Sequence, residues 1–520
     1  MRVLVVGNGM VGSRLVEELD GAGLDVTVLG SEPYEPYNRV LLSEVVAGKV
    51  DVAAITLPRP GGSAATVRTG RTALAIDRDA RLVLDDAGDA HAYDVLVLAT
   101  GARARIPEVP GLAPLPAGAH ALRTLDDARE IVAATTNARR AVVVGGGVLG
   151  LEAACGLARR GLHVTVVHGG AHLMDRQLDA DAAAAVVHGL DRLRIEHRTG
   201  AVTREVVVAD RHVRGVRLAA RGADATEDGE VLPADLLVLT TGTLPETGLA
   251  AAAGLEVRRG VVVDADGVTS DPAVFAVGDC AEPPDGATGL IAQGWDQARR
   301  LADLLRARAG GRGGAAREAA PVHGTDVVRL KAAGLEVVAM GVCGPGGGRQ
   351  GSGRSVRLSD PETGRHVEVV VQDGVVVGAT AVGAGPVAAD LVAAYTRRTP
   401  APRDPAQLLL RPVRGSRSEG DEPSPTLMPD RATVCRCNGV TKGDVVACWR
   451  HGATSVEDVA RSTRATTGCG GCTDAVCGIV DWLRRSDPPA ATPDGPDGAD
   501  GPAPERTVSP EQAGSAVLTP

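Results

Sequence analysis

Aromatic side chains are scarce in this chain, since only 2% of its 520 residues are Phe, Trp or Tyr. Aliphatic residues must therefore fill the core, and recognition by aromatic stacking is disfavoured. The sequence has no apolar run near the ~20 residues of a membrane span. It also has no long Lys/Arg block, and its net charge is −10. These absences argue against a membrane-spanning protein and against a nucleic-acid or anionic-lipid partner.

Cysteine is missing from the first part of the chain. No cysteine precedes Cys155, and most of the nine cysteines follow residue 434. This distribution is not that of a secreted disulfide framework, so we expect a reducing, cytoplasmic location. The apolar N-terminus runs directly into Gly7-Asn8-Gly9, which indicates the first strand of a fold and not a signal peptide. Nothing in the sequence indicates an oligomeric state.

Two segments repeat the order strand, glycine turn, helix, strand. The first combines strands at Val3–Val6 and Asp25–Leu29 with a helix at Val11–Leu19. The second combines strands at Ala141–Val144 and His163–Val167 with a helix at Leu151–Arg160. Short runs of β-branched residues are typical of strands buried on both faces of a parallel sheet. The pattern predicts an α/β fold with two Rossmann-type dinucleotide-binding domains.

The first glycine turn has the G-x-G-x-x-G pattern. Its first glycine allows the turn, the second lets a pyrophosphate approach the backbone, and the third allows close helix–strand packing. The N–H groups at the start of the helix then bind phosphate. An acid twenty residues beyond the last glycine is placed to bind ribose hydroxyls. We therefore expect a dinucleotide at Gly7, Gly9, Met10, Gly12 and Glu32.

The second turn repeats the pattern. The strand that follows it ends at His168, where an acid would favour NAD and an arginine NADP, so the choice between NADH and NADPH stays open. Strands at Val95–Ala99 and Leu236–Thr240 also end in Thr-Gly pairs, which are expected to pass close to a bound nucleotide. The first pair adds Thr100 and Gly101 to the first site. The second nucleotide is expected at Gly145, Gly147, Gly150, Glu152, His168 and Gly242.

The rest of the chain divides by composition. After a helix at Ala292–Ala309, residues 321–398 alternate predicted strands with one helix, which indicates a small α+β domain. Residues 399–430 are rich in Pro, Ser and charge and are predicted to be a linker. A small helical domain is expected at 431–486. Residues 487–520 consist mainly of Pro, Asp, Gly and Ala, so we expect a disordered tail.

Four cysteines stand as Cys435-x-Cys437 and, 31 residues later, Cys469-x-x-Cys472. Four thiolates in two close pairs suit an iron–sulfur cluster or a zinc ion. Zinc sites more often have two to four residues between the cysteines of both pairs, so the Cys-x-Cys spacing favours the cluster. Thr441 is expected to cap a helix after the first pair. Cys448 and Cys477 fall on predicted helices and are expected to be packing residues.

The two glycine turns, together with Gly278-Asp279 after a strand at Val274–Val277, resemble the flavoprotein disulfide reductase family over residues 1–310. The resemblance implies FAD in a domain of residues 1–115 and 240–315, with Asp279 near the flavin's ribityl–phosphate region. It implies NAD(P)H in a domain of residues 116–239. Members that reduce disulfides carry cysteine near the flavin, but this chain has Leu41-Leu42-Ser43-Glu44 there. Because Cys155 is expected to be a core thiol, no thiol relay is available.

Shorter stretches narrow the resemblance. Tyr37–Ser43 resembles the flavin-contacting segment of nitrite and rubredoxin reductase-type flavoproteins, which implies that Arg39 lies at the FAD. Leu173–Asp179 is similar to a segment of NAD(P)H-dependent nitrite reductase large subunits. The segment Thr243-Leu244-Pro245 departs from the family pattern, because relatives usually carry an arginine before this proline. Whatever that arginine does in the relatives is therefore in doubt for this chain. The cysteine segment, residues 431–486, resembles the bacterioferritin-associated-ferredoxin-type [2Fe–2S] domain, with Cys435, Cys437, Cys469 and Cys472 as ligands.

Together these resemblances imply an NAD(P)H-oxidising flavoprotein that passes electrons through FAD and a [2Fe–2S] cluster to a separate acceptor. Hydride transfer occurs on FAD, so no side chain is assigned a catalytic role. No siroheme region follows the cysteines, so nitrite reduction on this polypeptide is not expected. The chain resembles the electron-transfer subunit of assimilatory nitrate reductase, with a molybdenum nitrate reductase as its partner. The alternatives are a siroheme nitrite reductase subunit, a rubredoxin/ferredoxin-type carrier, or a non-enzymatic docking or iron-sensing module.

Overall fold

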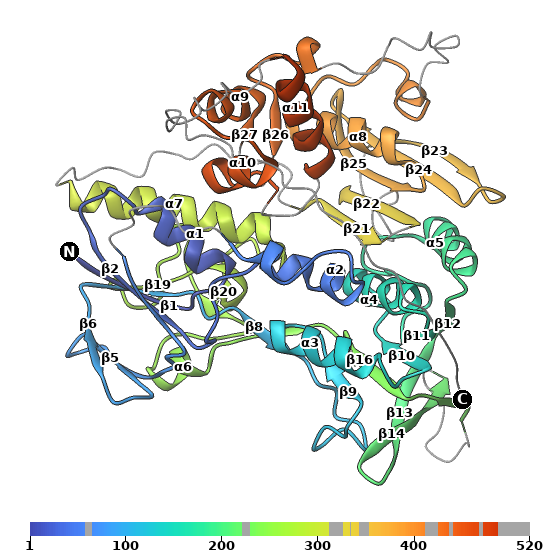
Figure 1. The fold of residues 1–520 in the computed structure, drawn as a ribbon, viewed down its shortest axis with the longest axis horizontal. Helices are drawn as coiled ribbons and strands as arrows, with labels where there is room; N and C mark the ends of the chain where they lie inside the picture. The colour runs from blue at the N-terminus through green and yellow to red at the C-terminus, as the bar shows by residue number, and fades with distance from the viewer. Residues whose placement is uncertain are drawn as a thin grey trace, which may run out of the picture.

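The computed structural model describes residues 1–57, 65–220, 229–310, 326–332, 334–342, 353–410, 425–435, 440–466 and 472–486. Three five-stranded sheets organise most of these residues, and a helical domain built from the C-terminal segments lies against them (Figure 1). The predicted tail at 487–520 lies outside the described residues. None of the described helices is both long enough and apolar enough to cross a membrane.

The first sheet is parallel, in the order β19-β7-β1-β2-β3. Helices α1 and α7 cover one face of it, because Leu15, Leu301 and Leu305 pack against the inward side chains of the strands. A small sheet, β4-β5-β6, and helix α6 lie on the other face. The bounds are β1 Arg2–Val6, α1 Met10–Glu18, β2 Asp25–Gly30, β3 Thr66–Thr69, β4 Ala73–Asp77, β5 Leu82–Asp85, β6 Ala90–Ala92, β7 Val95–Leu98, α6 Gly248–Ala252, β19 Val274–Ala276 and α7 Ile291–Ala309.

The second sheet is also parallel, in the order β12-β11-β10-β16-β9. Helices α4 and α5 pack into one core with it, and the antiparallel sheet β13-β14-β15 packs on the other face. The bounds are β9 Ala119–Ala121, α3 Leu125–Ala134, β10 Arg140–Val144, α4 Val148–Arg159, β11 His163–His168, α5 Ala180–Arg192, β12 Glu196–Thr199, β13 Ala201–Ala209, β14 His212–Ala220, β15 Val231–Pro233 and β16 Leu236–Leu239.

Short elements connect these two units. Strands β8 and β17 pair antiparallel beside the two Thr-Gly pairs. Helix α2 contacts both α3 and α4, so it bridges the units. The bounds are η1 Arg39–Leu41, α2 Leu42–Val46, η2 Ala53–Ile55, β8 Ala102–Ala104, β17 Thr243–Pro245, β18 Val261–Val262, η3 Gly278–Cys280 and β20 Ala281–Glu282.

The third sheet is antiparallel, in the order β21-β22-β25-β24-β23, with α8 against it. Its strand β23 was not predicted, because its side chains are mostly exposed and give no apolar run. Residues 399–410, the start of the predicted linker, lie against this sheet, and Leu409 is buried there. The other domain boundaries stay a prediction. The bounds are β21 Val328–Ala332, β22 Leu335–Gly341, β23 Arg354–Asp360, β24 Arg365–Gln372, β25 Val375–Val382, α8 Gly385–Arg397 and η5 Pro405–Leu408.

The helical domain packs three helices around a core that includes Trp449, Val459 and Ile479. The predicted cap is confirmed: Thr441 and Asp444 form a capping box at the start of α9. The α/β fold with a small α+β domain and a C-terminal helical domain is confirmed. The bounds are η6 Pro425–Leu427, β26 Thr433–Cys435, β27 Val440–Thr441, α9 Lys442–Arg450, α10 Val456–Thr463 and α11 Thr473–Ser486.

Leu15 offers a test of the first core. It is fully buried between the first sheet and α7, so Leu15→Ala leaves a cavity that costs about 2–5 kcal/mol. We expect a clear fall in the midpoint of thermal unfolding. The matched control is Leu74→Ala, because Leu74 on β4 is 61% exposed and its truncation should cost less than about 0.5 kcal/mol. Equal losses for both variants would contradict this packing.

Candidate functional site

The two glycine turns have the same backbone geometry. Gly7 N donates to Leu29 O at 2.8 Å, and Gly145 N donates to Val167 O at 2.8 Å. The two glycines have φ angles of 117° and 119°, a region that side chains disfavour. Each turn therefore links the first strand of its unit to the second strand at the same point, just before the helix begins.

The remaining glycines of each turn divide into two kinds. A Cβ on Gly12 would lie 2.0 Å from Gly7 O, and one on Gly150 would lie 1.7 Å from Gly145 O, so both positions require glycine for packing. A Cβ on Gly9 would meet only Arg39 Nε, at 4.0 Å, and one on Gly147 would meet nothing within 4 Å. These middle glycines face open space. Each turn therefore fits a pyrophosphate beside the N–H groups of a helix start.

Glu32 stands at the end of β2 beside the first turn. It accepts a hydrogen bond from Tyr37 Oη at 2.6 Å and forms an ion pair with Arg39, whose guanidinium lies 4.8 Å from the centre of the Tyr37 ring. Burial raises the pKa of Tyr37, so its hydroxyl stays protonated and donates. The structure thus brings the predicted residues Glu32 and Arg39 together with Gly9, as a dinucleotide site requires.

Asp279 is a further residue predicted for the first dinucleotide, and it follows β19, the edge strand of the first sheet. Its Oδ2 accepts from Arg123 Nη2 at 2.7 Å, and Arg123 Nε donates to Ala102 O at 2.9 Å. Thr100 Oγ1 donates to Glu246 O at 2.7 Å, which holds the strand end at the predicted Thr-Gly pair. Arg123 was missed from the sequence, since an isolated arginine belongs to no motif and its partner lies 156 residues away.

The residues predicted for the second nucleotide gather around the second turn. His168 Nδ1 accepts from Gly146 N at 3.3 Å. Gly242 has a φ of 98° and open space at its Cβ position. Glu152 is buried in α4, and its Oε2 accepts from Ser43 Oγ of α2 at 2.7 Å, so this carboxylate joins the two nucleotide-binding units. Whether these side chains contact a nicotinamide cofactor stays a prediction.

Two of the four predicted cluster ligands lie within the described residues. Cys435 ends β26 and Cys472 precedes α11, and both are buried in the core of the helical domain. Thr466 N donates to Cys472 Sγ at 3.2 Å. Backbone N–H groups aimed at sulfur are typical of iron–sulfur sites, so these thiols fit a cluster. Cys437 and Cys469 lie outside the described residues. Cys448 and Cys477 stand on α9 and α11, as expected.

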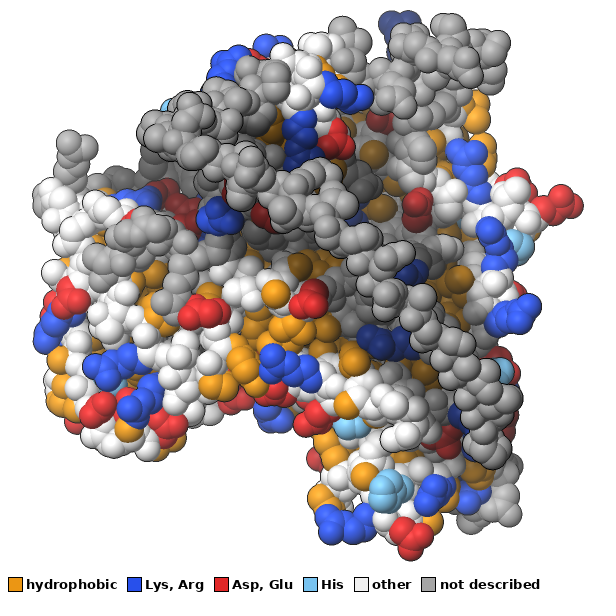
Figure 2. Space-filling view, viewed as in Figure 1, with side chains coloured by type: hydrophobic (Ala, Val, Ile, Leu, Met, Phe, Trp, Pro, Cys, Tyr) orange, Lys and Arg blue, Asp and Glu red, His pale blue; other side chains and the backbone are white. Residues whose placement is uncertain are grey.

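One ion pair joins the helical domain to the first unit. Arg464 Nε lies 2.6 Å from Glu17 Oε1, at the end of α1, and the Arg464 side chain is only 6% exposed. Burial raises the pKa of Glu17 and lowers the pKa of Arg464. In Figure 1 helix α10 lies directly above α7, and α9 and α11 lie farther from it. The surface is hollowed below this domain, and hydrophobic side chains gather there in the region of α2 and α3 (Figure 2).

Comparison with known proteins supports both halves of this arrangement. Residues 1–300 match the pyridine nucleotide-disulphide oxidoreductase family, and residues 433–482 match the BFD-like [2Fe-2S] binding domain. The chain is 32% identical to the nitrite reductase [NAD(P)H] of Bacillus subtilis (strain 168), over 94% of this chain and 58% of that protein. It is 31% identical to the assimilatory nitrate reductase electron transfer subunit of the same strain, over 95% of this chain and 61% of that protein.

A solved structure shows the same fold. The covalent putidaredoxin reductase–putidaredoxin complex aligns with a TM-score of 0.66 and 27% identity, over 78% of this chain and 95% of that one. The chain spans less than two thirds of the length of the two Bacillus proteins.

These matches confirm the predicted cofactors, FAD, NAD(P)H and a [2Fe–2S] cluster, and the class of enzyme, an FAD-dependent NAD(P)H oxidoreductase. The individual residues that hold each cofactor stay a prediction. The chain belongs to the pyridine nucleotide-disulphide oxidoreductase family and carries a C-terminal BFD-like [2Fe–2S] binding domain.

Proposed function

We propose that this chain oxidises NAD(P)H and passes the electrons through FAD and a [2Fe–2S] cluster to a separate acceptor, an assimilatory molybdenum nitrate reductase. The similarity to an assimilatory nitrate reductase electron transfer subunit extends over 95% of this chain and supports that acceptor. A cytoplasmic location, expected from the cysteine distribution, belongs to the same proposal.

The observation that carries the proposal is the buried ion pair between Arg464 and Glu17. Arg464 follows α10 and precedes Cys472, so it belongs to the segment that leads into the second cysteine pair. Glu17 belongs to α1, the helix that begins at the first glycine turn. The segment that leads into the second cysteine pair is therefore packed against the first unit, at the end of α1 away from the glycine turn. Such contact favours electron transfer between the two predicted cofactor sites over a separate iron-sensing module.

The side chains of this chain bind and orient. FAD would be held by Gly7, Gly9, Gly12, Glu32 and Asp279, and NAD(P)H by the turn from Gly145 to Gly150. When bound, the nicotinamide and the flavin would supply hydride transfer and the conversion of an electron pair into single electrons. The starts of α1 and α4 carry no side-chain cap, so N–H groups there would bind the two pyrophosphates. Arg123 holds the Asp279 carboxylate in place.

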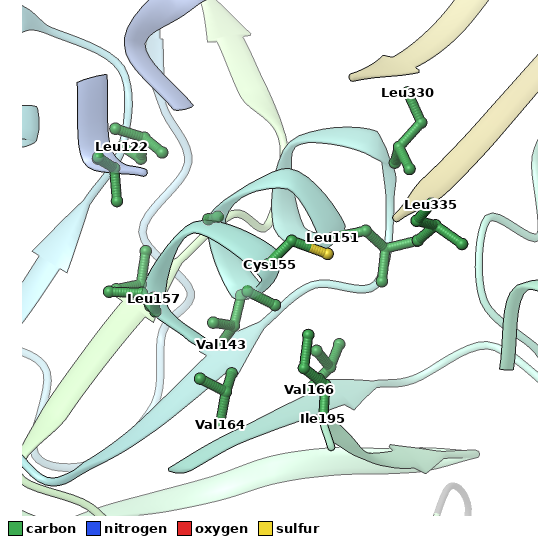
Figure 3. Close-up of a cluster of buried hydrophobic side chains, with 14 of the residues drawn as sticks. Leu122, Val143, Leu151, Cys155, Leu157, Val164, Val166, Ile195, Leu330 and Leu335 are labelled. Carbon is green, nitrogen blue, oxygen red and sulfur yellow. The ribbon is translucent and has the colours of Figure 1, made fainter. Parts of the chain in front are cut away.

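A thiol relay near the flavin is not supported by the cysteines of residues 1–310. Cys155 is buried in α4 among aliphatic side chains that include Leu151 and Leu335 (Figure 3). Burial raises its pKa to about 12. Cys280 is fully buried, donates to Leu98 O and has a raised pKa for the same reason. Thiols that stay protonated are poor nucleophiles, so the cluster is the more suitable exit for electrons.

Two other acceptors remain. The similarity to the nitrite reductase [NAD(P)H] over 94% of this chain favours a siroheme nitrite reductase subunit. The fold of the putidaredoxin reductase complex favours a rubredoxin/ferredoxin-type carrier. Rates with each purified acceptor distinguish them, since the physiological acceptor should be reduced fastest at equal concentration.

The proposal is tested by a pair of cysteine variants. Cys472→Ser removes a predicted cluster ligand, so NADH-driven reduction of nitrate reductase should be lost while ferricyanide reduction, which needs only the flavin, is retained. Cys448→Ser is the matched control, since Cys448 lies in the same domain on α9 outside the ligand set, and it should retain both activities. Iron analysis should show loss of iron in the first variant only. If Cys472→Ser still reduces nitrate reductase at the rate of the unaltered chain, the relay is excluded.

Removal of the Arg464–Glu17 ion pair should affect electron delivery to the acceptor. Arg464→Ala leaves Glu17 partly buried without its closest cation, which loosens the contact between the helical domain and α1. We expect delivery of electrons to the acceptor to fall about tenfold, with ferricyanide reduction unchanged. The control is Arg461→Ala, because Arg461 is 67% exposed and pairs only with Asp458 on its own helix among the described residues. Equal acceptor activity in both variants would show that the ion pair plays no part.

The burial of Cys155 predicts that its thiol reacts poorly with alkylating reagents. Because its pKa is about 12, only about one thiol in ten thousand is ionised near pH 8. Iodoacetamide should therefore leave Cys155 unmodified in the native protein and alkylate it after denaturation, as followed by mass spectrometry. Cys155→Ala should keep ferricyanide reduction within about twofold, since the thiol takes no part in the reaction. Rapid native labelling of Cys155, or loss of activity in a folded variant, would contradict the assignment.

A further inference from the structure

The second nucleotide-binding unit has no acid at the position that Glu32 takes in the first. Leu29 and Val167 are equivalent, because each carbonyl accepts the hydrogen bond from the first glycine of its turn. Glu32 follows Leu29 by three residues, and the residue three beyond Val167 is Gly170. The ribose-binding position of the second unit therefore carries no side chain.

The carboxylate of Asp175 fills that position. A Cβ on Gly170 would lie 2.2 Å from Asp175 Oδ2 and 2.6 Å from His168 Nε2. Asp175 belongs to the loop between β11 and α5, five residues further along the chain. Its carboxylate thus lies where a side chain of residue 170 would begin, and it supplies from the loop the negative charge that Glu32 supplies from the strand end.

The loop that carries Asp175 is held against the second glycine turn. Met174 N donates to Gly146 O at 2.9 Å, and the buried side chains of Leu173 and Leu178 anchor the loop on either side. His168 lies beside the carboxylate. His168 Nδ1 accepts from Gly146 N at 3.3 Å, and His168 Nε2 lies 3.4 Å from Asp175 Oδ1. Asp175 remains 40% exposed, so a ligand can reach it.

One neighbouring cation, Arg198, is already paired with carboxylates. Arg198 stands on β12 opposite Val167, but its guanidinium lies within 3.4 Å of Glu196 and 3.2 Å of Glu230. A 2′-phosphate needs an arginine to offset its charge, whereas a 2′-hydroxyl needs an acceptor. The described surroundings of Gly170 provide the acceptor.

We propose that Asp175 binds the adenosine ribose 2′-hydroxyl of NADH and that the chain selects NADH over NADPH. The carboxylate would repel the 2′-phosphate of NADPH at the same place. This inference rests on the proposed function, and it identifies which nicotinamide cofactor that function uses.

Steady-state reduction of ferricyanide by the full-length holoenzyme tests the inference. The KM for NADPH should exceed that for NADH by at least about tenfold, because like charges face each other. Asp175→Asn should raise the KM for NADH and narrow the preference about tenfold, with kcat within about twofold, since the reacting end of the cofactor is unaffected. The control is Asp181→Asn, because Asp181 is 69% exposed on the neighbouring α5 and should leave the KM ratio unchanged.

Each outcome has a separate meaning. Equal or better use of NADPH by the unaltered chain, or an unchanged KM ratio in Asp175→Asn, overturns the role of Asp175. Failure of both nucleotides to reduce ferricyanide contradicts the proposed function. If neither nucleotide reduces ferricyanide, or if Asp175→Asn does not fold, the selectivity is measured by calorimetric titration of the unaltered chain with NAD⁺ and NADP⁺. Tighter binding of NAD⁺ is expected, and tighter binding of NADP⁺ would overturn the proposed preference for NADH.

Discussion

The close approach of the third glycine to the first in each nucleotide turn is the constraint on which the rest of the structure depends. At Gly12 and Gly150 a methyl group would lie within 2.0 Å of a carbonyl oxygen, so α1 and α4 can begin only where no side chain intervenes. That contact places the free N–H groups of each helix at the carboxyl edge of its sheet. The middle glycines then leave the space that a pyrophosphate requires. The helix α1, directed in this way, carries Glu17 at its far end.

Apolar packing joins α2 and the third sheet to the second unit, and two buried polar contacts fix the relative positions of parts of the chain as well. Ser43 and Glu152 connect α2 to α4, and Arg464 and Glu17 connect the helical domain to α1. Burial raises the pKa of Glu17, which means that desolvation outweighs the attraction of the arginines. Such a pair contributes little net stability, but it fixes one relative position, because either charge left alone would be costly. Positioning, and not stability, is the role that suits an electron-transfer contact.

Much of the fold could be predicted from the sequence because parallel strands buried on both faces are continuous apolar runs. The strands at Val3–Val6 and Ala141–Val144 and both glycine turns were predicted in this way and are confirmed. Strand β23 was not predicted, since only Val356 and Leu358 of its seven residues are apolar and they do not form a continuous run. Arg123 and Arg464 were also missed. Each acts through a residue that folding brings near, and no local pattern records such a contact.

Electrons from a nicotinamide cofactor should reach a cluster held at Cys435 and Cys472. Anaerobic addition of NADH to the full-length holoenzyme, followed by low-temperature electron paramagnetic resonance, tests this transfer most directly. The signal of a reduced [2Fe–2S] cluster should appear along with bleaching of the flavin absorbance. Bleaching of the flavin by NADH while the cluster stays oxidised would exclude this electron transfer, provided that dithionite reduces the cluster in the same sample.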